Sequence, residues 1–174
     1  MLTPVIRMVV AALTNATTGV NAQLLALALD GTDARPDPVA AIISPTEDDA
    51  AVRPTHLVDW PVLSVTCAAP VTTTKPGVQG MSFDAPSVAI TIAHITRDGD
   101  LGAKEWRDTD YILRATAKSL NAGLFASDKA AARVRGTVSI LKQNSMTFGP
   151  VTADLGNAQV TGAVDLNLHA RETA

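Results

Sequence analysis

The side chains best suited to chemistry are a single cysteine, Cys67, and three histidines, His56, His94 and His169. Zinc sites usually show local pairs of ligands, and none of the histidines has another histidine or a cysteine two or four residues away. A nucleophilic cysteine needs a neighbour that lowers its pKa, and the sequence favours no histidine for that role. We therefore interpret Cys67 as a small buried residue and His94 as a polar residue near the end of a strand.

Two pairs of aspartates, Asp98 with Asp100 and Asp108 with Asp110, have the spacing of paired acids. Both pairs lie where a turn or a helix start is expected, and aspartate is favoured there for local reasons. The consecutive acids at 47–49 do not match the spacing of a calcium loop. No phosphate-binding loop and no G-x-S-x-G motif occurs. We therefore predict no catalytic residue, no cofactor and no metal, and a protein that is not an enzyme.

Composition and charge narrow the class of protein. The chain has 174 residues, is 47% hydrophobic and carries a net charge of −3, which suits one domain over 1–174. It has no block of Lys or Arg, so we expect no stable binding to nucleic acid. One cysteine allows no intramolecular disulfide, and no apolar run reaches transmembrane length. We expect a soluble intracellular protein whose few aromatic residues favour a subunit stabilised by neighbours.

The N-terminal third is expected to hold two helices and a proline-rich loop. Residues 4–13 place Val5, Met8, Val9 and Ala12 on one face at helical spacing. A second helical piece over 22–29 follows, with Asn21 as its cap and Asp30-Gly31 as its end. A long loop at about 30–56 then surrounds one short or edge strand from Val39 to Ile43, because proline tolerates little else.

The remainder alternates strands with one helix. Strands are expected in residues 57–69, where Pro61 restricts the early part to an edge or bulge, and in 87–95. A long loop at about 69–86, with a turn at Lys75-Pro76-Gly77, joins them. The residues of the expected inner stripe of the next helix are Ile112, Ala115, Thr116, Ser119, Leu120 and Gly123.

That helix is expected within residues 104–125, where Asp108 or Thr109 can start it and Asn121 and Gly123 can end it. Two C-terminal strands are expected over 133–148 and 158–174. The last alternates apolar and polar residues, as in an antiparallel sheet with one solvent-exposed face. The expected fold class is α+β, an antiparallel or mixed sheet flanked by helices on one face, in a single domain.

This order of elements resembles the tail terminator (tail completion) proteins of tailed bacteriophages. The resemblance covers most of the chain and rests on the N-terminal helix, the "WPVLSV" strand entering a long loop, the "SVAITIAHI" strand, the "DTDYILRATAKSL" helix and the closing "VTGAVDLNLHA" strand. It implies a structural virion protein at the head–tail neck, made in the host cytoplasm. Such proteins form a ring, usually a homohexamer, that caps the tail tube and joins it to the connector while DNA passes through the lumen.

The resemblance implies that the edge strands and the solvent-exposed face of the sheet contact neighbouring subunits. Loops 70–86 and 97–108 would then face the partner ring or the lumen. The charged residues proposed for these contacts are Lys75, Arg97, Asp98, Asp100, Lys104 and Glu105. The long 31–56 and 69–86 segments also allow a related neck protein. Two alternatives stay open: a small enzyme or ligand-binding domain with a pocket near His94, and a subunit of another tube-like assembly.

Overall fold

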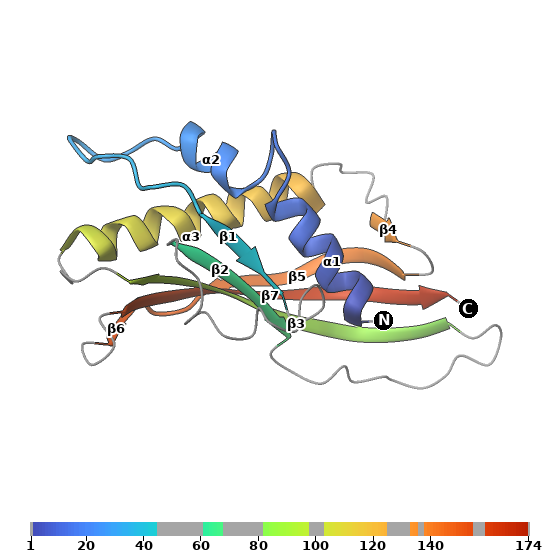
Figure 1. The fold of residues 1–174 in the computed structure, drawn as a ribbon. Helices are drawn as coiled ribbons and strands as arrows, with labels where there is room; N and C mark the ends of the chain where they lie inside the picture. The colour runs from blue at the N-terminus through green and yellow to red at the C-terminus, as the bar shows by residue number, and fades with distance from the viewer. Residues whose placement is uncertain are drawn as a thin grey trace.

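The computed structural model describes residues 2–44, 61–67, 82–97, 103–124, 133–135, 138–154 and 159–173. In chain order its elements are α1 (Leu2–Leu13), α2 (Val20–Ala26), β1 (Ala41–Ile43), β2 (Val62–Cys67), β3 (Ser82–Arg97), α3 (Ala103–Leu124), β4 (Arg133–Arg135), β5 (Val138–Phe148), β6 (Thr152–Asp154) and β7 (Gln159–Thr173). The fold is α+β, as the sequence predicts, and the helices lie on one face of the sheet (Figure 1).

The described strands form one mixed sheet. Its order is β1-β2-β3-β7-β5-β4, and β6 also pairs with β7. β1 runs parallel to β2, and the other described pairs are antiparallel. β1 stands at one end of this order, so the prediction of a short edge strand within Val39–Ile43 is confirmed.

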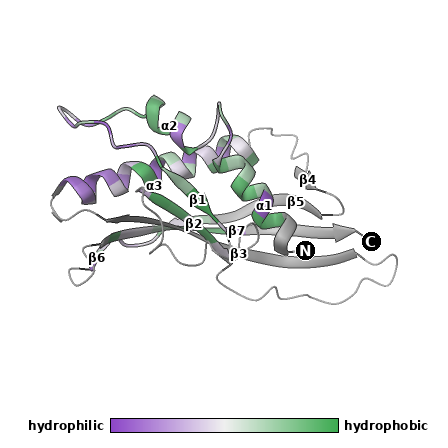
Figure 2. Cartoon of the chain, viewed as in Figure 1, coloured by the Kyte–Doolittle hydropathy of each residue, from purple (hydrophilic) through white to green (hydrophobic). Residues whose placement is uncertain are grey.

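The core forms where the helices pack on the sheet. The predicted face of α1 is buried as expected, with Val5 and Val9 at 0% exposure. Buried residues of α1 and α3 join Val65, Val164 and Leu166 of the sheet in one hydrophobic cluster. Figure 2 shows the apolar residues gathered along α1 and β2, while the first half of α3 is hydrophilic.

The predicted inner stripe of α3 is confirmed and is polar at two buried positions. Thr116 donates its hydroxyl to the carbonyl of Ile112 at 2.8 Å, and Ser119 donates to the carbonyl of Ala12 at 3.2 Å. Both hydroxyls are therefore satisfied inside the core, as buried polar groups must be. The Ser119 bond also links α3 directly to α1.

Two glycines allow these elements to approach closely. A Cβ on Gly123 of α3 would lie 2.7 Å from the Cβ of Ala12 in α1. A Cβ on Gly162 of β7 would lie 2.7 Å from Leu113 Cδ1 and 3.0 Å from Thr109 Cγ2. The small stripe of α3 thus fits against both the neighbouring helix and the sheet.

Several predicted boundaries differ from the structure. α3 begins at Ala103, not at Asp108 or Thr109, because the intervening residues are good helix formers. Residues 82–86, predicted as loop, belong to β3, where they pair with β7 up to a register shift between Ala85 and Val88. The cap of α2 is Gly19 rather than Asn21. β6 is an additional strand that the sequence did not indicate. Residues 45–56 and 69–81 of the two predicted loops lie outside the described residues.

Within the described part of the chain, no helix combines the length and the apolar character needed to cross a membrane.

Candidate functional surfaces

The residues with catalytic potential are spread along the sheet. His94 pairs in register with Leu63 of β2 and Gly162 of β7, while His169 lies seven residues further along β7. At about 3.3 Å per residue, that separation is about 23 Å. Cys67 pairs with Ile90, four residues from His94, or about 13 Å along the strand. The described positions therefore bring neither a histidine pair nor a Cys–His pair together; His56 lies outside the described residues.

The acidic pair in α3 is divided between separate ion pairs. Asp108 Oδ2 lies 3.7 Å from Lys104 Nζ, and Asp110 Oδ2 lies 2.7 Å from Arg114 Nη2. Residues two apart on a helix do not face each other. Burial raises the pKa of Asp108, and the nearby charges of Lys104 and Arg107 lower it only in part. Asp98 and Asp100, the other predicted pair, lie outside the described residues.

A polar network fastens the loop after α2 to the first half of α3. Tyr111 donates its hydroxyl to Asp33 Oδ2 at 2.8 Å and accepts the backbone N–H of Asp30 at 2.8 Å. Arg107 donates to Asp33 Oδ1 at 3.0 Å. The bond from Asp30 acts to lower the pKa of Tyr111, but the bond to Asp33 and burial outweigh it and raise that pKa. Because each member has a structural partner, we interpret this network as a latch.

Neither this latch nor the residue that supports it was predicted from the sequence. Arg35 donates its guanidinium to the carbonyls of Leu24 and, at 3.3 Å, Leu27, and so satisfies carbonyls at the end of α2. The only signals available in sequence were the single tyrosine of the chain and a basic residue shortly after the helix.

The face of the sheet that points away from the helices is a further candidate surface. Residues opposite each other in paired strands share a face, and Thr66, Thr91 and Asp165 follow one another across β2, β3 and β7. No described helix lies over this face (Figure 1). Its described side chains are small or polar and partly or fully exposed at Ser64, Thr66, Thr147, Thr161, Ala163, Asp165 and Asn167. Two apolar residues of this face are exceptions: Val62 is 0% exposed, and Ile43, which pairs with Ser64, is 9% exposed.

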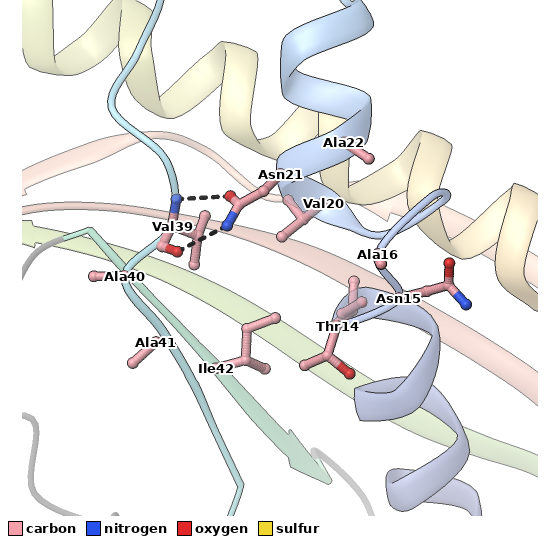
Figure 3. Close-up of a pocket in the computed structure, with 11 residues that line it drawn as sticks. Thr14, Asn15, Ala16, Val20, Asn21, Ala22, Val39, Ala40, Ala41 and Ile42 are labelled. Carbon is pink, nitrogen blue, oxygen red and sulfur yellow. Dashed lines mark hydrogen bonds between the residues drawn. The ribbon is translucent and has the colours of Figure 1, made fainter.

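A cavity lies beside the edge of β1 that faces away from β2. It measures about 340 Å³ and is lined by Leu13, Thr14, Asn15, Ala16, Val20, Asn21, Ala22, Val39, Ala40, Ala41 and Ile42. Figure 3 shows the amide of Asn21 holding Val39, with Ile42 on the side of the α1–α2 turn and Ala41 on the opposite side. Asn21 Oδ1 accepts the N–H of Val39 at 2.8 Å, and Asn21 Nδ2 donates to its carbonyl at 3.0 Å. Asn21, predicted as a helix cap, instead pairs its side-chain amide with the backbone of Val39 next to β1; we call this pair of hydrogen bonds the Asn21 clamp.

Three large apolar side chains are exposed among the described residues. They are Leu25 of α2 at 71%, Phe148 of β5 at 55% and Trp106 of α3 at 45%. Trp106 and Phe148 belong to a chain that has only six aromatic residues, of which two are Trp, one is Tyr and three are Phe. Exposed aromatic residues are a common feature of protein interfaces.

The charged residues predicted as contacts divide between several places. Arg97 ends β3, in register with Gln159. Lys104 and Glu105 lie in the first turn of α3 rather than in a loop, so the predicted 97–108 loop is wrong for residues 103–108. Lys104 is exposed and paired with Asp108, whereas Glu105 is only 7% exposed and offers a partner little surface. Lys75, Asp98 and Asp100 lie outside the described residues.

In the described residues, no three His, Cys, Asp or Glu side chains are grouped in a way that could hold a metal ion. No family model matches the chain, and no curated protein matches it.

Proposed function

We propose that this chain is a structural subunit of the head–tail neck of a tailed bacteriophage, a tail terminator that forms a ring, most simply a hexamer. The ring would cap the tail tube, join it to the connector and let DNA pass through its lumen. The proposal rests on the resemblance in element order and on one observation: an exposed sheet face of small and polar residues with no described helix over it.

Two further features support assembly over catalysis. The chain offers both components of a protein interface on different surfaces: a polar sheet face away from the helices, and the exposed aromatic side chains of Phe148 and Trp106 on the helix-bearing side. The net charge of −3 provides little attraction for the phosphate backbone, which suits a ring through which DNA slides.

A pocket centred on His94 receives no comparable support. His94 is paired on both sides within the sheet, and its partner Gly162 lies directly beneath Leu113 and Thr109 of α3. This row of the sheet therefore carries the helix packing.

The experiment is a native mass measurement of the purified chain at increasing concentration, together with the variant Thr66→Lys. We expect a closed oligomer with a mass near six subunits, and a large loss of that oligomer when a lysine stands on the open face. Thr66→Ala controls for the loss of the threonine itself, and Ala11→Lys adds the same charge at an exposed position on α1.

A monomer at every concentration would contradict the proposal, as would equal oligomers for Thr66→Lys and Ala11→Lys. A second readout is binding of duplex DNA at physiological salt, where we expect no retention on the ring.

A further inference from the structure

The edge of β1 that faces away from β2 presents backbone groups that can pair with another strand. The N–H of Ala40 donates to the carbonyl of Pro61 at 2.8 Å, so the peptide groups of residue 40 face β2. Those of Val39 face the opposite way, toward Asn21. Because peptide groups alternate in direction along a strand, the N–H and C=O groups of Ala41 and Ile43 also face away from β2. Among the described strands, none lies on that side.

Asn21 shows how this edge is satisfied. Its side-chain amide pairs with both the N–H and the C=O of Val39, as the peptide group of an added strand would. The clamp ends there, and the cavity of about 340 Å³ continues along Ala41 and Ile42. Its lining contains no charged residue, so it suits an uncharged, apolar side chain carried on an extended backbone.

The other end of the same sheet carries a complementary edge. β4 pairs with β5 only at residues 138–140, so residues 141–148 of β5 border no described strand on their outer side. Phe148 pairs with Val164, which lies on the helix-bearing face, and is 55% exposed. The cavity beside β1 lies on that same face, between the strand and the α1–α2 turn (Figure 3).

We infer that strand β5 of a second copy adds to the edge of β1 that faces away from β2, with Phe148 entering the cavity beside the α1–α2 turn. This inference rests on the proposed ring and names one contact between its subunits, in addition to the open sheet face. Among the described strands, β1 lies at one end of the sheet and the outer side of β5 at the other, and joining these two ends gives a head-to-tail contact that closes into a ring when the rotation between copies allows it. In one sheet β5 runs antiparallel to β1, since β1 and β2 are parallel and the three pairings that follow are antiparallel. Copies related by a ring axis keep that relation, so the added strand is antiparallel.

The first test is cross-linking in a Cys67→Ala background with Ala41→Cys and Thr147→Cys in the same chain. Ala41 pairs with Val62, and Thr147 with Asp165, so both positions lie on the face away from the helices. A short bis-maleimide should give a ladder of covalent oligomers up to the full ring, whereas each single cysteine variant should give no ladder. A dimer from Ala41→Cys alone would show β1 pairing with itself and would overturn the inference.

The second test uses the aromatic side chain. Phe148→Ala should weaken assembly at least tenfold, while Leu25→Ala, which removes the other strongly exposed large side chain, should change it less than twofold. Equal effects of the two variants would contradict a role for Phe148 in the cavity. Each variant is first checked for an unchanged circular dichroism spectrum.

The third test needs no substitution. Amide hydrogen exchange at Ala41 and Ile43 should slow at least tenfold when the wild-type chain passes from monomer to ring. Rings of the expected mass with unprotected amides at both residues would refute the inference and leave the proposed function standing. A chain that stays monomeric would refute both.

Discussion

The two faces of the sheet show how one set of strands serves two purposes. On the helix-bearing face, Val65, Val164 and Leu166 are fully buried. On the opposite face, Thr66 is exposed and Asp165 is partly exposed. Neighbouring residues of a strand point to opposite faces, so stability and surface chemistry are assigned to alternating positions. Changes on the first face should therefore alter folding, and changes on the second should alter assembly.

The largest loss of stability is expected from Leu120→Ala. Leu120 is fully buried in α3 within the main cluster, so its truncation should lower the free energy of unfolding by about 2–5 kcal/mol. Thr66→Ala on the open face should lower it by about 1 kcal/mol or less, chiefly because threonine is favoured over alanine in strands. Urea unfolding of both variants measures the difference, and similar losses would remove the distinction between the faces.

A smaller loss is expected from Gly123→Ala. Alanine is favoured over glycine inside a helix by about 1 kcal/mol, but here its Cβ would lie 2.7 Å from Ala12 Cβ and 3.2 Å from Ala12 Cα. The two helices would have to separate, and we expect a net loss of about 1–3 kcal/mol.

The neighbouring substitution Ala122→Gly provides the control for Gly123→Ala. It exchanges the same two residues in the opposite direction at a half-buried position, and it should cost only about 1 kcal/mol from helix propensity. A Gly123→Ala variant that is more stable than the wild type in thermal unfolding would show that α1 and α3 are not in tight contact.

At the edge of the sheet, Asn21→Ala should cost about 1 kcal/mol, because the variant loses both hydrogen bonds to Val39. Asn121→Ala, at an exposed position of α3, should change stability by less than about 0.5 kcal/mol. Thermal melts of the monomer compare the two. Equal losses of stability in the two variants would mean that the hydrogen bonds from Asn21 to Val39 do not stabilise the monomer.

The spacing of apolar residues was enough to predict the elements that bury a single face. The stripe of α3 and the alternation of β7 were predicted correctly because burial of one face repeats at a fixed spacing. The short edge strand near Val39–Ile43 was predicted because the prolines around it exclude most other structures.

Local signals failed where tertiary contacts decide the outcome. Asn21 has the residue type of a helix cap, yet its amide pairs with Val39, which is 18 residues away. Asp108 has the residue type of a helix start, yet α3 begins a full turn earlier, and Asp108 pairs with Lys104 inside the helix. The latch between Asp33 and Tyr111 spans 78 residues, and no local pattern encodes such a contact.

The smallest effect is expected from Asp108→Asn, and its sign depends on pH. Burial holds the pKa of Asp108 above its ordinary value of 3.8 despite Lys104 and Arg107, so the folded chain binds a proton more readily than the unfolded chain. The contribution of Asp108 to stability is therefore lowest at neutral pH and rises as pH falls toward the folded-state pKa.

Asparagine resembles the uncharged carboxyl, so Asp108→Asn should be slightly more stable than the wild type at neutral pH, by less than about 1 kcal/mol. That advantage should shrink as the pH is lowered from about 7 to about 4, since the wild-type carboxyl then takes up its own proton. Parallel thermal melts across this range measure the difference, with Asp110→Asn as the control on the more exposed Arg114 pair. A variant that is less stable at neutral pH would show that the ion pairs with Lys104 and Arg107 outweigh burial on this face of α3.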